Sequence, residues 1–574
     1  MKYFIHTCFL LLLGYASAAQ QFYVKGVVRD ETGKPLPNAT ILLSSTGYKY
    51  SSGSEGSFGI LVNRLPDTLT IIADGYMKQV KPVNTQAFVE VRLRREAVST
   101  RSTVNHLASQ TQNLKRDVQQ KWFAGEETYA SLVENNFVDA AEYPLTHLSL
   151  NVDRASYSNV RRFLKTGSPV PPDAVRIDEM LNYFNFNYTA PPEGETFSLH
   201  SILTDCPWNK KNRLLLMQVN AKKLRFESLP PTHLVFLVDV SGSMDMPNRL
   251  PLLKDGFKML VQNLRETDSV SIAVYGGTVG VALATTGGNE KEKIYKVIDS
   301  LQPGGFTPGA SGVRLAYQLA RDHFIKDGNN RVVLATDGDF NVGLQTEEEL
   351  ERMIATEQKK GIYLTCLGIG MGNYKDSKIQ MLAQRGHGNF AYLDNFAEAE
   401  KVLMREFAAS LYVVAEDALL QVTFDPLQVQ RYRLIGFDNK YKAVIDSASV
   451  VQGGEIGSGY SNLIAFELQG QQQLTEADIL FSISYKTPGG GNAPTFNDAK
   501  SVPYMKFEDL PAPYRLAGAV MMFGGMLKDS KFIKGKWKDI ARIAAGAADA
   551  DNLPQQEFLS LIELAKDVYS KKRK

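Results

Sequence analysis

The sequence has few cysteines and almost no net charge. Its 574 residues include three cysteines, and none stands in a Cys-x-x-Cys pair, which excludes a disulfide scaffold. Whether Cys206 and Cys366 pair is left open. Lysine and arginine number 64 against 62 aspartates and glutamates, a net charge of +2. So small a charge produces no strong field toward nucleic acid or anionic lipid, and neither is an expected partner.

Long apolar runs and the common catalytic motifs are also missing. After the first 19 residues no long stretch is both apolar and free of charge, so no transmembrane span is expected in the mature chain. Gly-x-Ser-x-Gly, His-Glu-x-x-His and the Gly-Lys-Ser/Thr phosphate loop do not occur. What is present, 44% hydrophobic and 22% charged residues, is typical of a globular protein, at this length with roughly three to five domains.

Residues 1–19 have the composition of a secretory signal peptide. Lys2 supplies a positive charge, residues 4–13 an apolar core, and Ala16-Ser17-Ala18 a small-residue cleavage site. The core is about half as long as the roughly 20 residues that a spanning helix needs, although an uncleaved anchor is the alternative. We therefore expect an exported protein of the periplasm or cell envelope, with the outer surface as a further alternative.

The hydrophobic pattern divides the rest of the chain into β-rich and α/β parts. Five short strands between residues 22 and 95 predict a small β-sandwich. Between residues 233 and 411, apolar strands alternate with amphipathic helices, which predicts a doubly wound α/β domain. Strand patterns flank that part on both sides, so we expect it to be inserted in a β-rich domain. Three amphipathic helices are expected from about residue 513 to 572.

These patterns give a set of predicted boundaries. The stretch 98–120 lacks aromatic residues and is rich in Ser, Thr, Asn and Gln, as a linker is. The predicted parts are a signal peptide (1–19), a β-sandwich (22–95), a linker (96–140), a mixed β/α flank (141–232), the α/β domain (233–411), a β-rich flank (412–490) and a C-terminal helical segment (491–574).

An aspartate and two serines follow the first strand of the α/β part. Asp239 ends the apolar strand, and Ser241 and Ser243 stand in the turn that opens a helix. In open α/β sheets, ligands bind at the carboxyl ends of the strands. One carboxylate with two hydroxyls is an oxygen-only donor set, which Mg²⁺ and Ca²⁺ prefer and zinc does not. Thr307 in a glycine-rich loop and Asp337 at the next strand end are the candidate further ligands.

Asp-x-Ser-x-Ser, a loop threonine and a strand-end Thr-Asp-Gly, in this order, resemble the metal-ion-dependent adhesion site of von Willebrand factor type A domains. The resemblance implies that Ser241, Ser243 and Thr307 bind a divalent cation, while Asp239 and Asp337 act directly or through water. It implies Mg²⁺, with Ca²⁺ or Mn²⁺ as alternatives. It also implies a protein partner whose Asp or Glu carboxylate the ion captures.

Two longer resemblances cover most of the chain. From about residue 143 to 571, the stretches 151–164, 174–184, 334–343 and 453–459 look like the bacterial YfbK-like family, which flanks such a domain with characteristic N- and C-terminal parts. The turn residues of the predicted sandwich, among them Gly33 and Pro35, resemble the carboxypeptidase regulatory-like domain, a transthyretin-like sandwich without catalytic residues.

We consider three functions. The predicted one is a metal-dependent adhesion or scaffold module without enzymatic activity. The second is a metal-dependent hydrolase of the cell envelope, for which Asp339 is the candidate base, although a turn-capping role for this carboxylate is favoured. The third is a structural role without metal. A haloacid-dehalogenase-type phosphotransferase is disfavoured, because Ser241 stands where its second aspartate is needed.

Overall fold

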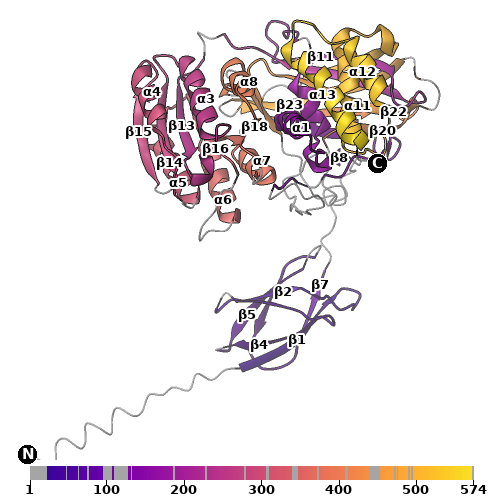
Figure 1. Ribbon diagram of the computed structural model, residues 1–574. Helices are drawn as coiled ribbons and strands as arrows, with labels where there is room; N and C mark the ends of the chain where they lie inside the picture. Colours follow the sequence, from indigo (N-terminus) through magenta and orange to yellow (C-terminus); the bar gives the residue numbers. More distant parts are fainter. Residues whose placement is uncertain are drawn as a thin grey trace, which may run out of the picture. The chain divides into compact units, whose positions relative to one another are not determined.

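The structure is a computed structural model, and its described residues form two compact units, within residues 1–103 and 104–574 (Figure 1). The predicted signal peptide and most of the predicted linker lie outside the described residues. The described residues are 22–46, 48–62, 64–73, 76–94, 106–108, 127–130, 132–184, 186, 188–225, 229–276, 279–305, 309–338, 347–371, 374–406, 411–437, 453–470, 474, 476–488, 491–492 and 496–571.

The described part of the smaller unit is a β-sandwich, as predicted. Its two sheets have the strand orders β4-β1-β7 and β3-β2-β5-β6. Alternate side chains, such as those of Phe58, Ile60 and Val62, point into one shared apolar core. Strands β3 and β6 add to the five that were predicted, while the resemblance to the carboxypeptidase regulatory-like domain stays a prediction. The strands are β1 (Phe22–Asp30), β2 (Thr40–Leu43), β3 (Lys49–Ser51), β4 (Ser57–Val62), β5 (Asp67–Ile72), β6 (Gln79–Val83) and β7 (Val89–Leu93).

The larger unit contains a long sheet whose strands come from both sides of the α/β domain. β12 pairs with β22 over its length, with Leu215 opposite Phe466, and β10 pairs with β19. This confirms that the α/β domain is inserted in a β-rich domain. The strands are β8 (His106–Ala108), β9 (Val138–Asp139), β10 (Leu145–Ser149), β11 (Phe197–Asp205), β12 (Arg213–Ala221), β19 (Val413–Phe424), β20 (Val429–Ile435), β21 (Gly454–Gly457), β22 (Ser461–Gly470), β23 (Glu476–Thr487), β24 (Gly491–Asn492) and β25 (Phe496–Met505).

Two of the predicted boundaries differ from the structure. Strand β25 lies within 491–574, so the helices begin only at Ala512. Its polar sequence shows no alternation, and pairing with β23 and β11 makes it a strand. The predicted linker also ends too late, because Glu127 forms a buried ion pair with Arg162 and β9 pairs with β20. This polar segment is attached to the larger unit by an ion pair and by backbone pairing, and a search for apolar periodicity detects neither.

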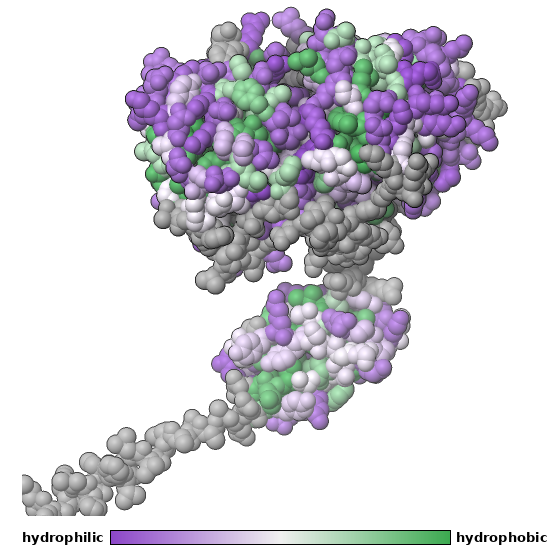
Figure 2. All heavy atoms as spheres, in the orientation of Figure 1, coloured by the Kyte–Doolittle hydropathy of each residue, from purple (hydrophilic) through white to green (hydrophobic). Residues whose placement is uncertain are grey.

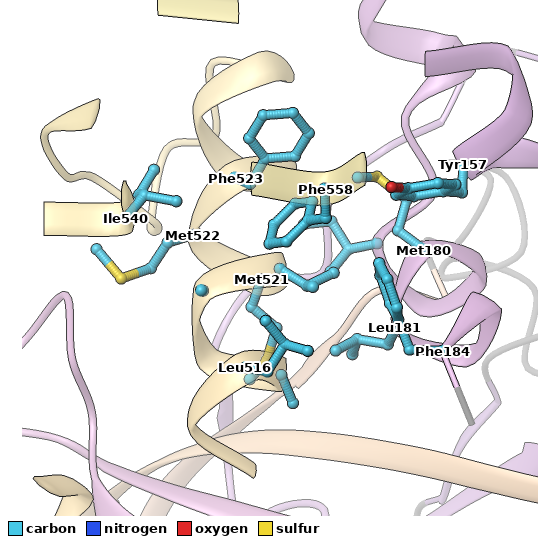
Figure 3. Packing of buried hydrophobic residues seen from close by; sticks show 14 of the residues in the cluster. Tyr157, Met180, Leu181, Phe184, Leu516, Met521, Met522, Phe523, Ile540 and Phe558 are labelled. Atoms are coloured by element: carbon cyan, nitrogen blue, oxygen red, sulfur yellow. The ribbon is translucent and has the colours of Figure 1, made fainter. Parts of the chain in front are cut away.

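The C-terminal helices pack on the helices that precede the α/β domain (Figure 3). Phe558 of α13 lies between Phe184 and Phe523, with ring centroids 5.6 and 5.2 Å away. Tyr157, Phe184 and Phe558 belong to one buried cluster, so the two ends of the larger unit share a core. The helices are α1 (Ala155–Lys165), η1 (Pro172–Ala174), α2 (Ile177–Tyr183), η5 (Phe507–Asp509), α11 (Ala512–Leu527), α12 (Trp537–Ala545) and α13 (Leu553–Lys571).

The α/β domain has a six-stranded sheet in the order β15-β14-β13-β16-β17-β18. The central strand β13 buries Phe236 against the α3 side and Leu237 against the α5 side, which confirms the doubly wound fold. The antiparallel edge strand β15 was not predicted. The elements are β13 (Thr232–Asp239), η3 (Gly242–Met244), α3 (Leu250–Gln262), β14 (Ser269–Tyr275), β15 (Gly280–Gly287), α4 (Lys291–Ser300), α5 (Gly309–Asp322), β16 (Asn329–Thr336), α6 (Glu347–Gln358), β17 (Ile362–Ile369), α7 (Asp376–Arg385), β18 (Phe390–Leu393), α8 (Phe396–Glu400) and η4 (Lys401–Arg405).

The surface and the thiols bear on two of the sequence expectations. On the visible face of the larger unit, hydrophilic residues predominate and hydrophobic ones form separate patches (Figure 2). Among the described residues, no helix is long and apolar enough to cross a membrane. Cys206 and Cys366 are buried free thiols, so the structure contains no disulfide between them.

A buried glutamate of the β-rich domain faces the α/β domain. Glu455 of β21 lies with its Oε1 atom 3.7 Å from the Nδ1 atom of His387. Burial raises the pKa of Glu455 to about 8, the nearby carboxylates of Glu416 and Asp417 add to this, and Arg331 opposes it. The folded chain therefore holds a proton on Glu455 that the unfolded chain releases near pH 4.5.

We expect Glu455→Gln to flatten the pH dependence of stability. Because the folded state binds the extra proton, the contribution of Glu455 is lost as the pH rises from about 4.5 to about 8. At about 1.4 kcal/mol per pKa unit, the upper limit for this shift is about 5 kcal/mol. Urea unfolding at pH 5 and pH 8.5 measures it, with the exposed Glu193→Gln as control. Equal pH dependence in wild type and Glu455→Gln would contradict the assignment.

Candidate functional site

Three neighbouring strands fix the carboxylate of Asp239. The side chain is buried at the carboxyl end of β13. Its Oδ1 atom accepts a hydrogen bond from the backbone N–H of Ser241 at 2.9 Å. Its Oδ2 atom accepts from the hydroxyls of Tyr275 on β14 and Thr336 on β16, each at 3.1 Å. Burial raises the pKa of Asp239, and the hydrogen bonds from Ser241 and Tyr275 oppose this. The carboxylate is therefore held in one orientation before any ligand binds.

The two serine hydroxyls lie side by side in the following turn. The Oγ atoms of Ser241 and Ser243 are 3.0 Å apart. The end of β14 packs closely against this turn, because Gly276 has a φ of +123° and a Cβ atom there would lie 2.4 Å from the backbone nitrogen of Ser241. A larger residue at Gly276 would push the serines out of place.

The glycine-rich loop that precedes α5 reaches the same turn. The backbone N–H of Gly304 donates to the carbonyl of Val240 at 2.7 Å, and the carbonyl of Gly305 accepts from Gly242 at 3.3 Å. The candidate ligand Thr307 comes two residues later but lies outside the described residues. Asp339, the candidate base of the hydrolase hypothesis, also lies outside them.

Asp337 directly follows the adjacent strand β16 and is fully buried. Its Oδ2 atom accepts a hydrogen bond at 2.6 Å from the guanidinium of Arg249, which the sequence did not single out. The following Gly338 has a φ of +88°, and its N–H donates to the Thr336 hydroxyl at 3.1 Å. Asp239 and Asp337 are near enough for the second carboxylate to contribute to the raised pKa of the first.

The structure thus brings Asp239, Ser241, Ser243 and Asp337 together at one edge of the sheet. The donor atoms are all oxygens, and two of the four groups are uncharged hydroxyls. Across the residues that the structure describes, no group of three or more His, Cys, Asp or Glu is placed to hold a metal. The four residues fit a hard divalent cation such as Mg²⁺, Ca²⁺ or Mn²⁺ rather than zinc.

This fold, with Asp-x-Ser-x-Ser after the first strand and an aspartate after the neighbouring strand, defines a von Willebrand factor type A domain, and the family model of that name matches residues 233–405. Models described as von Willebrand factor and as the C-terminal part of the uncharacterized protein YfbK match residues 124–216 and 409–568. The chain belongs to the YfbK family: it is 36% identical to the uncharacterized protein YfbK of Escherichia coli (strain K12) over 478 residues, 77% of this chain and 82% of that protein.

Two more distant similarities cover smaller parts of the chain. The magnesium-chelatase 67 kDa subunit of Chlorobaculum parvum is 26% identical over 306 residues, 47% of either chain. A solved von Willebrand factor type A protein from Catenulispora acidiphila has a TM-score of 0.38 and 13% identity, and the match covers 66% of this chain and 91% of that one.

The von Willebrand factor type A domain indicates a protein-interaction or adhesion module. Von Willebrand factor type A domains bind protein partners, and many do so through a divalent cation held at a site of this kind. The family match favours a role without catalysis and leaves the particular ion and partner to be proposed.

Proposed function

We propose that this chain is an exported binding protein that captures an Asp or Glu side chain of a protein partner through a divalent cation. The observation that carries the proposal is the meeting of Asp239, Ser241 and Ser243 with Asp337 at one sheet edge. Mg²⁺ is the expected ion, with Ca²⁺ and Mn²⁺ as alternatives. When bound, the ion supplies a positively charged anchor for a carboxylate.

The residues of the chain favour capture of an external carboxylate. Two of the donors, Ser241 and Ser243, are neutral, and the carboxylate of Asp239 is already shared among three hydrogen-bond donors. Such a donor set neutralises the charge of a divalent ion only in part, which leaves the ion attractive to an acidic ligand. We propose Thr307 as a further ligand, on the resemblance and on the position of its loop.

The loops beside the site also expose apolar side chains. Met246 is 49% exposed and Met371 is 38% exposed. The carbonyl of Met246 accepts a hydrogen bond from the backbone N–H of Arg249, and that of Met371 accepts one from its guanidinium. Flexible methionine side chains pack against differently shaped partners. The two exposed methionines therefore favour a protein surface over a free acid as the ligand.

The proposal includes export to the periplasm or cell envelope, and it rests there on the signal-like residues 1–19. Cell fractionation tests this part of the proposal. We expect the chain in the envelope fraction, in a mature form that lacks residues 1–19. A chain found only in the cytoplasmic fraction would contradict export without affecting the binding site.

The binding test uses the mature full chain and immobilised peptides that differ only in Glu or Gln. We expect retention on a subset of the Glu peptides with Mg²⁺ or Mn²⁺ present, and loss of retention in excess chelator or on the matched Gln peptides. Retention that ignores both the chelator and the Glu-to-Gln change would overturn the proposal. Cation-dependent hydrolysis of the peptides would instead favour the hydrolase.

A further inference from the structure

One guanidinium connects two parts of the candidate site with a neighbouring turn. The Nη1 atom of Arg249 donates to the carbonyl of Ser243 at 2.7 Å and to the carboxylate of Asp337 at 2.6 Å. Its Nη2 atom donates to the carbonyl of Met371 at 2.8 Å. These partners come from the turn after β13, the end of β16 and the turn after β17.

The surroundings allow the guanidinium little movement. The Arg249 side chain is 6% exposed and that of Asp337 is 0% exposed. Gly370, whose φ is +79°, packs directly on it, because a Cβ atom there would lie 2.5 Å from the Nε atom of Arg249. The carbonyl of Gly370 is in turn bonded by the hydroxyl of Tyr392. The arrangement is built into the core of the domain and does not depend on a surface side chain.

The charges of these groups determine what a cation meets. Asp239 and Asp337 carry two negative charges when ionised, and Arg249 offsets one of them. A divalent cation at the site would then retain a net positive charge, and a carboxylate from outside would complete the neutralisation. Without Arg249, the two aspartates would neutralise the cation by themselves, and the demand for an external anion would fall.

We infer that Arg249 is a positioning residue that makes cation binding depend on an acidic ligand. It holds Asp337 and the two turns in place, and its charge keeps the cation weakly bound alone and tightly bound together with a carboxylate. This inference rests on the proposed function and adds to it the thermodynamic coupling between the ion and the partner.

The test measures Mn²⁺ binding to the full mature chain by electron paramagnetic resonance, with and without a Glu peptide selected in the retention assay. Arg249→Met removes the charge at similar length, and Arg249→Lys keeps it. In Arg249→Met, we expect Mn²⁺ alone to bind about tenfold tighter and the peptide to lose most of its enhancement. In Arg249→Lys, we expect the enhancement to be largely retained.

Thermal unfolding provides a second measurement that does not require the peptide. Arg249→Met leaves Asp337 buried without this cation, so its unfolding temperature without Mn²⁺ should fall by several degrees. Mn²⁺ should restore it, with a larger upward shift than in the wild type. A merely structural role would lower the unfolding temperature without increasing the Mn²⁺ shift.

The outcomes separate the two proposals. Failure of the wild-type chain to bind Mn²⁺ both with and without the peptide would overturn the proposed function together with this inference. Binding by the wild type, with the same Mn²⁺ affinity and the same peptide enhancement in Arg249→Met, would overturn the inference alone. Equal loss of the enhancement in Arg249→Met and Arg249→Lys would show that charge is not the cause and would also overturn it.

Discussion

Replacing Asp239 with alanine is expected to abolish both cation binding and partner capture. The carboxylate lies at the centre of the site, where it orients the Ser241 turn through the backbone N–H of that residue and contacts Tyr275 and Thr336 on the neighbouring strands. Removal of a group that only orients metal ligands costs about 10- to 100-fold in affinity. Since Asp239 would also act on the cation itself, we expect a loss of at least about 100-fold, measured by Mn²⁺ titration and by retention on Glu peptides.

The fold should survive this change. The alanine removes the acceptor that the hydroxyls of Tyr275 and Thr336 and the backbone N–H of Ser241 share, and losing these hydrogen bonds costs about 1–3 kcal/mol. It also removes a buried charge whose ionisation burial opposes, and this offsets part of that cost. We therefore expect a small change in unfolding temperature without cation and no upward shift when Mn²⁺ is added.

Asp322→Ala is the matched control for Asp239→Ala. Asp322 is an exposed aspartate at the end of α5, and its replacement should leave cation binding and capture unchanged. Capture that persists in Asp239→Ala, or a control as defective as Asp239→Ala, would show that the site does not reside at these residues.

The hydrophobic pattern of the sequence was sufficient to predict the α/β domain. In α3, the apolar residues that the spacing puts on one face, including Leu253, Phe257 and Val261, are all buried. A face at helical spacing against buried strands has few other ways to pack. Phe324 continues the apolar spacing of α5 in the sequence but is 43% exposed, because the helix ends at Asp322 and its periodicity no longer applies.

The polar contacts of the site and of the interfaces could not be predicted in the same way. Arg249 contacts Asp337 and Met371, which lie 88 and 122 positions further along the chain. A single arginine before a helix carries no local signal of such partners. For the same reason, the segment around Glu127 reads as a linker although its carboxylate forms a buried ion pair with Arg162. Apolar periodicity reports which face is buried, and it contains no information on which buried charges meet.

The most extensive of these buried contacts joins three parts of the larger unit. Arg161 of α1 is 3% exposed at its side chain. Its guanidinium donates to Asp394, which follows β18, to Glu398 of α8 at 2.7 Å and to Glu557 of α13 at 2.9 Å. The hydroxyl of Tyr183 accepts a further bond at 3.1 Å. One cation therefore compensates carboxylates from the α/β domain and from the C-terminal helices.

Arg161→Met is accordingly expected to destabilise the larger unit by about 3–5 kcal/mol at pH 8, because it leaves buried carboxylates without their cation. Burial already raises the pKa of Asp394, and Arg161 opposes this. Without the arginine, Asp394 should take up a proton at a higher pH, so part of the lost stability should return at pH 5. Urea unfolding at both pH values measures the effect.

Lys534→Met is the control, because the pair of Lys534 with Asp529 is 62% and 94% exposed and such pairs contribute about 1 kcal/mol or less. A loss in Arg161→Met that is equally small, or independent of pH, would show that packing rather than charge compensation holds these parts together.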